Sequence, residues 1–120
     1  MSRDQLTNMD RLSYIEQLPD NWNGYGGRRI DPQVIEKCRE IIKGICIQPV
    51  VFPTGRRTIQ LQYELKDKSY LEFEIYTDKI VCMQVPQRVY TNAVFETFTE
   101  ININKINQIV KEFYAAENKL

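Results

Sequence analysis

The sequence predicts an α+β fold, a two-layer sandwich in which a small antiparallel sheet is covered by about three helices. Apolar residues recur at helical spacing over residues 4–18, 34–45 and 103–113, whereas residues 58–76 alternate between apolar and polar side chains as strands do. The chain of 120 residues shows no linker or repeat, so we expect one domain over residues 1–120 in the order α-α-β-β-β-(β)-α. The first few residues and residues 115–120 are expected to fray.

Each predicted helix has a start or a stop signal. The first covers residues 4–18, where apolar side chains recur every third residue, and it ends before Pro19. The second begins at Asp31-Pro32, because aspartate caps a helix well and proline at the first helical position loses no needed hydrogen bond. The last is capped by Asn102. The expected buried stripes are Leu6, Met9, Leu12, Ile15 and Leu18 in the first helix, Val34, Ile35, Cys38, Ile41, Ile42 and Ile45 in the second, and Ile103, Ile106, Ile109, Val110 and Phe113 in the last.

The middle of the chain predicts a meander of three to four strands. Residues 58–65 and 70–76 alternate, residues 80–85 are apolar on both faces until Gln84, and polar turns separate the three segments. Residues 94–99 are the candidate for a fourth strand.

Composition excludes several classes of function. The 16 basic and 16 acidic residues balance, so no net charge attracts the chain to nucleic acid or to an anionic membrane. The chain has no histidine, which removes Ser-His-Asp and Cys-His triads and histidine-containing zinc sites. We interpret Cys38, Cys46 and Cys82 as reduced thiols in or near the core. With no signal peptide and no membrane span, we expect a cytoplasmic protein that is not an enzyme and holds no cofactor or metal.

Residues 21–27 read Asn-Trp-Asn-Gly-Tyr-Gly-Gly and form a glycine-rich loop that carries large aromatic side chains. One interpretation is a connector anchored on the core by Trp22. The other is a recognition loop, in which Trp22 and Tyr25 are followed by Arg28 and Arg29, because aromatic and arginine residues dominate binding hot spots. The loop lacks the spacing of the common phosphate-binding motifs.

The same motif carries a resemblance. Together with the Asp-Pro helix start, Pro-Thr-Gly and the Ile-Gln-Leu-Gln-Tyr and Leu-Glu-Phe-Glu-Ile strands, it resembles small bacterial proteins of mobile genetic elements with an Asn-Trp-Asp-Gly-Tyr-Gly motif. The similarity covers about residues 10–85, and Asn23 stands where aspartate is usual. It implies a defence, antitoxin or phage-related setting and assigns no catalytic residue.

Two polar surfaces of opposite sign are candidates for binding. In either of two registers, pairing of the first two strands places Gln60, Gln62, Glu64, Glu72 and Glu74 on one sheet face. That face is either simply solvated or, through Glu72 and Glu74, a docking surface for a basic partner.

Arg28-Arg29 and Arg56-Arg57 each follow a glycine in a predicted loop. They are either solvated charges or, if the loops meet, one basic cluster that recognises carboxylate or phosphate groups. In a nucleic-acid site, Trp22, Tyr25 and Tyr90 would be stacking candidates.

These features lead to two hypotheses of function. The first is a non-enzymatic protein-binding module such as an antitoxin, immunity protein or inhibitor, with Trp22, Tyr25, Arg28, Arg29, Glu72 and Glu74 as contact residues. The second is a nucleic-acid-binding accessory or regulator that uses the two arginine pairs. Because a small meander leaves an edge strand unpaired, we also expect that the chain can form a homodimer or pair with a partner strand through that edge.

Overall fold

The computed structural model describes residues 1–117 and confirms the α+β fold. The helices are α1 (Arg3–Glu16), α2 (Pro32–Gly44) and α3 (Ile103–Glu117). The strands are β1 (Val50–Pro53), β2 (Ile59–Glu64), β3 (Tyr70–Ile75), β4 (Ile80–Val85) and β5 (Val94–Phe98), with two 3-10 turns, η1 (Pro86–Arg88) and η2 (Tyr90–Asn92), between β4 and β5. The strands form one antiparallel meander in the order β1-β2-β3-β4-β5.

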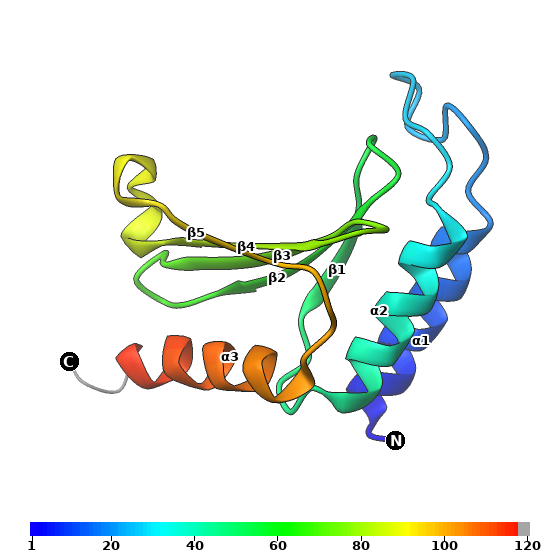
Figure 1. The fold of residues 1–120 in the computed structure, drawn as a ribbon. Helices are drawn as coiled ribbons and strands as arrows, with labels where there is room; N and C mark the ends of the chain where they lie inside the picture. The colour runs from blue at the N-terminus through cyan, green and yellow to red at the C-terminus, as the bar shows by residue number, and fades with distance from the viewer. Residues whose placement is uncertain (118–120) are drawn as a thin grey trace.

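The helices cover only one face of this sheet. In Figure 1, α3 runs below the sheet, and α1 and α2 pack against each other beside it. Alternate strand residues such as Ile59, Leu61 and Phe73 join the buried residues of all three helices in one hydrophobic core. The opposite face, called the open face below, carries the polar residues of β2 and β3, and none of the helices formed by the described residues lies over it.

The helix start signals are confirmed at atomic detail. Asp31 accepts a hydrogen bond from the Gln33 N–H at 2.9 Å, and Asn102 accepts one from the Lys105 N–H at 3.0 Å. Ser2 forms a capping box with Gln5 at the start of α1, which begins at Arg3.

The ends of the helices differ slightly from the prediction. Helix α1 ends at Glu16, two residues early, and Leu6 is 49 % exposed. A spacing of three residues drifts around a helix of 3.6 residues per turn, which turns Leu6 away from the core. Residues 115–117 belong to α3, and the predicted fraying of residues 118–120 lies outside the described part of the chain.

The sheet has five strands, one more than the upper limit of the predicted three to four. Strand β5 confirms the fourth candidate, whereas β1 was not predicted because a four-residue segment ending in Pro53 shows no alternation. Proline is compatible with β1 because this strand lies at the sheet edge. In the observed register of β2 and β3, Gln62 lies opposite Glu72 and Gln60 lies opposite Glu74. This is one of the two registers that place the polar residues of both strands on one face.

Candidate functional site

The loop between α1 and α2 (residues 17–31) is held in shape by its own asparagine side chains. Asn23 Oδ1 accepts hydrogen bonds from the N–H groups of Tyr25 at 2.9 Å and Gly27 at 2.8 Å. Asn21 Oδ1 accepts one from the Gly26 N–H at 2.7 Å. A carboxylate oxygen can accept the same bonds, so aspartate at position 23 would be equivalent to Asn23 as an acceptor.

Glycines allow this loop to fold tightly. Gly24 and Gly26 have φ values of +76° and +79°, in the region that glycine adopts at no steric cost. A Cβ atom on Gly27 would lie 2.7 Å from the Asn23 side chain, because the loop closes on itself at that point. The glycine-rich sequence therefore encodes one defined backbone path.

The loop buries one aromatic side chain and displays the other. Trp22 is half-buried, and its Nε1–H donates to the Arg28 carbonyl at 3.0 Å. Tyr25 is 93 % exposed. Trp22 therefore ties the loop to its own backbone at Arg28, whereas Tyr25 is free to contact a partner.

The two arginine loops meet. The Arg28 N–H donates to the Gly55 carbonyl at 3.3 Å, and Arg57 Nε donates to the Arg29 carbonyl at 3.3 Å. The Asp31 N–H donates to the Arg57 carbonyl at 3.2 Å, which ties the start of α2 to the β1–β2 turn. Residues almost thirty positions apart in the chain thus form one surface.

A hollow of about 320 Å³ lies at this junction and is called the arginine hollow below. It is lined by Asp20, Arg28, Arg29, Ile30, Pro32 and Arg57. The Arg29 N–H donates to Asp20 Oδ1 at 2.9 Å, so Asp20 holds the backbone of the loop in this arrangement. Three guanidinium groups against one lining carboxylate give the hollow a positive character.

The four predicted arginines have different environments. Arg57 lies 3.4 Å from Asp31, and Arg56 lies 2.8 Å from Glu74. Among residues 1–117, Arg28 and Arg29 form no ion pair. Only the first arginine pair is therefore fully available to a partner.

The predicted acidic face also contains an internal ion pair. Glu74 is 5 % exposed, and its oxygens accept from Arg56 Nη2 at 2.8 Å, Gln60 Nε2 at 3.0 Å and Thr58 Oγ1 at 2.8 Å. Burial acts to raise the pKa of this carboxyl, but the hydrogen bonds outweigh burial and hold its pKa below the usual value. Arg56 and Glu74, which the sequence suggested for two different surfaces, are bonded to each other.

Glu72 lies two residues away on the same strand face and has no cation within ion-pair distance among the described residues. Burial raises its pKa above the usual value, and the Glu74 carboxylate adds to that effect, although the hydroxyl of Tyr70, 2.8 Å away, and Arg56 oppose it. The open face therefore offers a partner one uncompensated carboxylate rather than an acidic patch.

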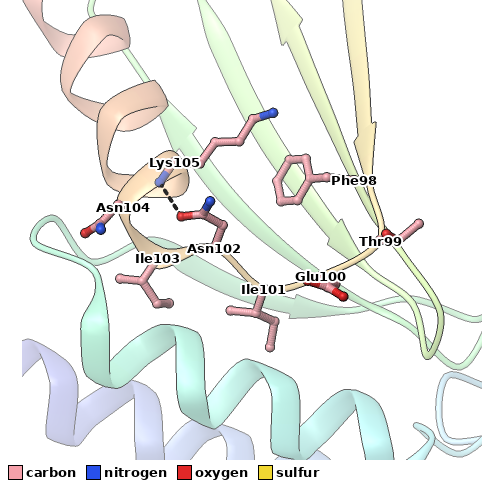
Figure 2. A pocket seen from close by; sticks show the side chains of 8 residues that line it. All are labelled: Phe98, Thr99, Glu100, Ile101, Asn102, Ile103, Asn104 and Lys105. Atoms are coloured by element: carbon pink, nitrogen blue, oxygen red, sulfur yellow. Dashed lines mark hydrogen bonds between the residues drawn. The ribbon is translucent and has the colours of Figure 1, made fainter.

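A second hollow lies elsewhere on the described part of the chain. It has a volume of about 480 Å³ and is lined by the consecutive residues 98–105 between β5 and α3. Figure 2 shows Ile101 and Ile103 pointing from this segment toward α2, while Asn102 accepts the Lys105 N–H. The hollow is the inside of a chain bend, and none of the predicted site residues lines it.

Sequence reasoning missed the hydrogen-bonding roles of the residues that build the site. Asp20, Asn21 and Asn23 fix the loop, and Thr58 and Gln60 orient Glu74. Asparagine and aspartate next to glycines are typical of side chains that bind nearby backbone N–H groups, so this signal was present in the sequence.

The cysteines are only partly as predicted. Cys38 and Cys82 are buried, but Cys46 is exposed because the chain leaves α2 at Gly44 and the side chain falls outside the core. Burial raises the pKa of Cys38 and, with the nearby Glu96 carboxylate, raises that of Cys82 to about 12. Both thiols are therefore protonated near neutral pH.

Residues 1–117 contain no group of three metal-ligating side chains that could hold an ion. Among the same residues, no helix has the length and apolar character needed to cross a bilayer. Comparisons with protein-family models, with curated proteins and with solved structures gave no match.

Proposed function

We propose that this chain is a small non-enzymatic protein-binding module, of the antitoxin, immunity or inhibitor type. The loop between α1 and α2 and the adjoining arginine hollow would contact the partner. The observation that carries the proposal is a Tyr25 side chain that is 93 % exposed on a loop whose backbone is fixed by hydrogen bonds.

A fixed loop favours binding because less conformational entropy is lost when the partner docks. Tyrosine offers a large contact area with few rotatable bonds, and arginine is the other residue enriched in hot spots. Tyr25, Arg28 and Arg29 are all exposed on this loop. They supply the aromatic and cationic contacts that such an interface needs.

The charges of the site favour an acidic partner surface. Arg28 and Arg29 have no internal carboxylate partner among the described residues, and Arg57 lines the same hollow. A guanidinium group binds a carboxylate through two parallel hydrogen bonds, which adds geometric specificity. We therefore expect aspartate or glutamate side chains of the partner to enter the arginine hollow.

The groups that could support catalysis have internal roles or unfavourable pKa values. The thiols of Cys38 and Cys82 are buried with raised pKa values, which disfavours the nucleophilic thiolate. Glu74, the most buried carboxylate of the open face, is bonded to Arg56, Gln60 and Thr58. These observations support a binding role over an enzymatic one.

The test is capture of partners from a lysate of the native host at physiological salt, with and without nuclease. A loop variant carries Tyr25→Ala, Arg28→Ala and Arg29→Ala. Because all three side chains are exposed, the variant should fold normally, as circular dichroism would check. A control variant removes an exposed tyrosine and two exposed basic residues elsewhere, through Tyr14→Ala, Arg3→Ala and Lys111→Ala.

The proposal expects one protein in stoichiometric amount that survives nuclease treatment. It should be captured by the wild type and by the control variant and lost with the loop variant. A loop variant that captures the same partner as the wild type would show that binding takes place elsewhere on the chain.

A second candidate function is nucleic-acid binding, and the convergence of the two arginine loops favours it. The guanidinium groups of Arg28, Arg29 and Arg57 line one hollow, and Tyr25 could stack on a base. Binding of this kind falls steeply as salt rises, because each phosphate contact releases counterions. A fluorescence anisotropy titration of single and double strands at several salt concentrations tests it, and an affinity that is absent or independent of salt would exclude it.

A further inference from the structure

The two edges of the sheet are protected to different degrees. At β1, side chains of α1 occupy the free edge, since Asn8 donates to the Pro49 carbonyl at 3.1 Å and Arg11 donates to the Val51 carbonyl. Strand β5 is the other edge of the sheet, and Val94 and Phe95 on it are 61 % and 63 % exposed. An exposed apolar edge of this kind is a template for pairing with another strand.

The hydrogen bonds of the β3–β4 turn show which groups of β5 point outward. The Tyr76 N–H donates to the Lys79 carbonyl at 2.9 Å, which makes these two residues a hydrogen-bonded pair. Bonded and non-bonded pairs alternate along antiparallel strands, so Ile80, Cys82 and Gln84 of β4 direct their backbone groups toward β5.

The same alternation then applies to β5. The partners of those β4 residues are Phe98, Glu96 and Val94, whose backbone groups face inward to β4. The N–H and C=O groups of Phe95 and Thr97 consequently point away from the sheet, on a side where residues 1–117 supply no further strand.

We infer that β5 pairs with β5 of a second copy of this chain, antiparallel and about a two-fold axis at Phe95. In this register each Phe95 N–H donates to the Phe95 carbonyl of the other copy, and each Thr97 N–H donates to the Ala93 carbonyl of the other copy. The two sheets become one continuous sheet, and the two Phe95 rings lie opposite each other on its open face.

The charges on β5 favour this register, and they allow a second copy of the chain to pair with the strand. An axis at Glu96 would place two glutamates directly opposite each other, which is destabilising. An axis at Phe95 instead places Glu96 opposite Val94 of the other copy, and Glu96 keeps its ion pair with Lys105 of its own chain.

The whole chain and its central aromatic residue also suit self-association. The formal net charge is zero, so two copies do not repel each other overall. Paired aromatic side chains across antiparallel strands are stabilising, and the two-fold axis pairs Phe95 with itself. A strand of an unrelated protein could pair with β5 without bringing two copies of Phe95 together.

Sedimentation equilibrium of the purified chain from micromolar to millimolar concentration tests the inference. A reversible dimer is expected. Phe95→Lys should weaken it at least tenfold, because it places two positive charges at the axis. Thr97→Pro should weaken it as well, because it removes an outward N–H while the bonds to β4 remain. Val50→Lys, at an exposed position on the other edge strand, is the matched control and should leave the dimer unchanged.

Disulfide trapping tests the register. In a Cys46→Ser background, Phe95→Cys should cross-link two copies under mild oxidation, because residues of a hydrogen-bonded pair lie within disulfide range. Glu96→Cys should not cross-link at a comparable rate. A chain that stays monomeric at all concentrations, a dimer that tolerates both β5 substitutions, or faster cross-linking at position 96 would each overturn the inference. The loop variant of the preceding section should dimerise like the wild type, so the two proposals can fail separately.

Discussion

Glu72 and Glu74 lie on the same face of β3, two residues apart, and the structure predicts opposite effects on stability when each is changed to glutamine. The carboxylate of Glu74 accepts hydrogen bonds on both oxygens, whereas Glu72 accepts one from Tyr70 and has no cation partner within residues 1–117. Glutamine keeps the size of the side chain and removes the charge. The pair of variants therefore isolates the effect of charge at two neighbouring positions.

The magnitude for Glu74→Gln follows from its hydrogen bonds. The amide nitrogen replaces one acceptor oxygen, so one side of the carboxylate loses its bonds. A hydrogen bond to a charged group contributes about 1.5–3 kcal/mol. The Arg56 side chain is 62 % exposed and can bind water instead, so its contribution is discounted to the level of a surface pair, about 0–1 kcal/mol. We expect a loss of about 2 kcal/mol, which for this chain lowers Tm by about 8 °C.

The dependence on pH follows from the direction of each pKa shift. The pKa of Glu74 is lowered from 4.5, so its ionisation stabilises the fold above that pH, and the stabilisation is lost as pH falls below about 4.5. The pKa of Glu72 is raised from 4.5, so its ionised form destabilises the fold at neutral pH, and the effect disappears as pH falls toward 4.5. At pH 7, Glu74→Gln should lower the free energy of unfolding and Glu72→Gln should raise it.

The assay is urea unfolding followed by circular dichroism at pH 7 and at several acidic pH values, together with thermal melts. Both differences from the wild type should shrink toward acid, because the wild-type carboxylates become neutral there. If Glu74→Gln does not lower the free energy of unfolding at pH 7, the role assigned to the Arg56–Glu74 pair is incorrect. If Glu72→Gln lowers it, the destabilising effect assigned to the charged form of Glu72 is incorrect.

Two further predictions concern a backbone position and the cysteines. Arg57 has a φ of +70°, so Arg57→Gly should remove backbone strain and raise the free energy of unfolding. Loss of the ion pair with Asp31 should offset part of this gain, and chemical unfolding measures the sum. Partner binding should weaken in the same variant, as partner capture would measure. For the cysteines, a thiol reagent should modify Cys46 alone in the native protein and all three cysteines after unfolding, as mass spectrometry can count; rapid native modification of Cys38 would contradict its burial.

The elements that the sequence predicted well are those with a strong local pattern. Helix α2 has both an Asp-Pro start and an unbroken apolar stripe, and strands β2 and β3 alternate without interruption. Strand β1 has neither signal. It exists because its backbone pairs with β2 and its Val51 side chain enters the core, which are contacts between distant residues.

The placement of the candidate residues on loops and strands was predictable, but the bonds between their side chains were not. The sequence placed the arginine pairs in loops and Glu74 on a strand. Only the fold shows that Arg56 reaches Glu74, while Arg28 and Arg29 form no ion pair among the described residues. Side-chain partners across the chain depend on where the loops approach, and no local pattern encodes that. The exposed position of Cys46 could not be predicted for the same reason.

The loop between α1 and α2 divides its residues into two groups with different tasks. Asn21 and Asn23 hold the backbone, whereas Tyr25, Arg28 and Arg29 point their side chains into solvent. Substitutions in the second group alter the contact surface without disturbing the first, so they carry little penalty for folding. Such a division would let the exposed surface of the loop vary through a few substitutions while the hydrogen bonds that hold its backbone stay the same.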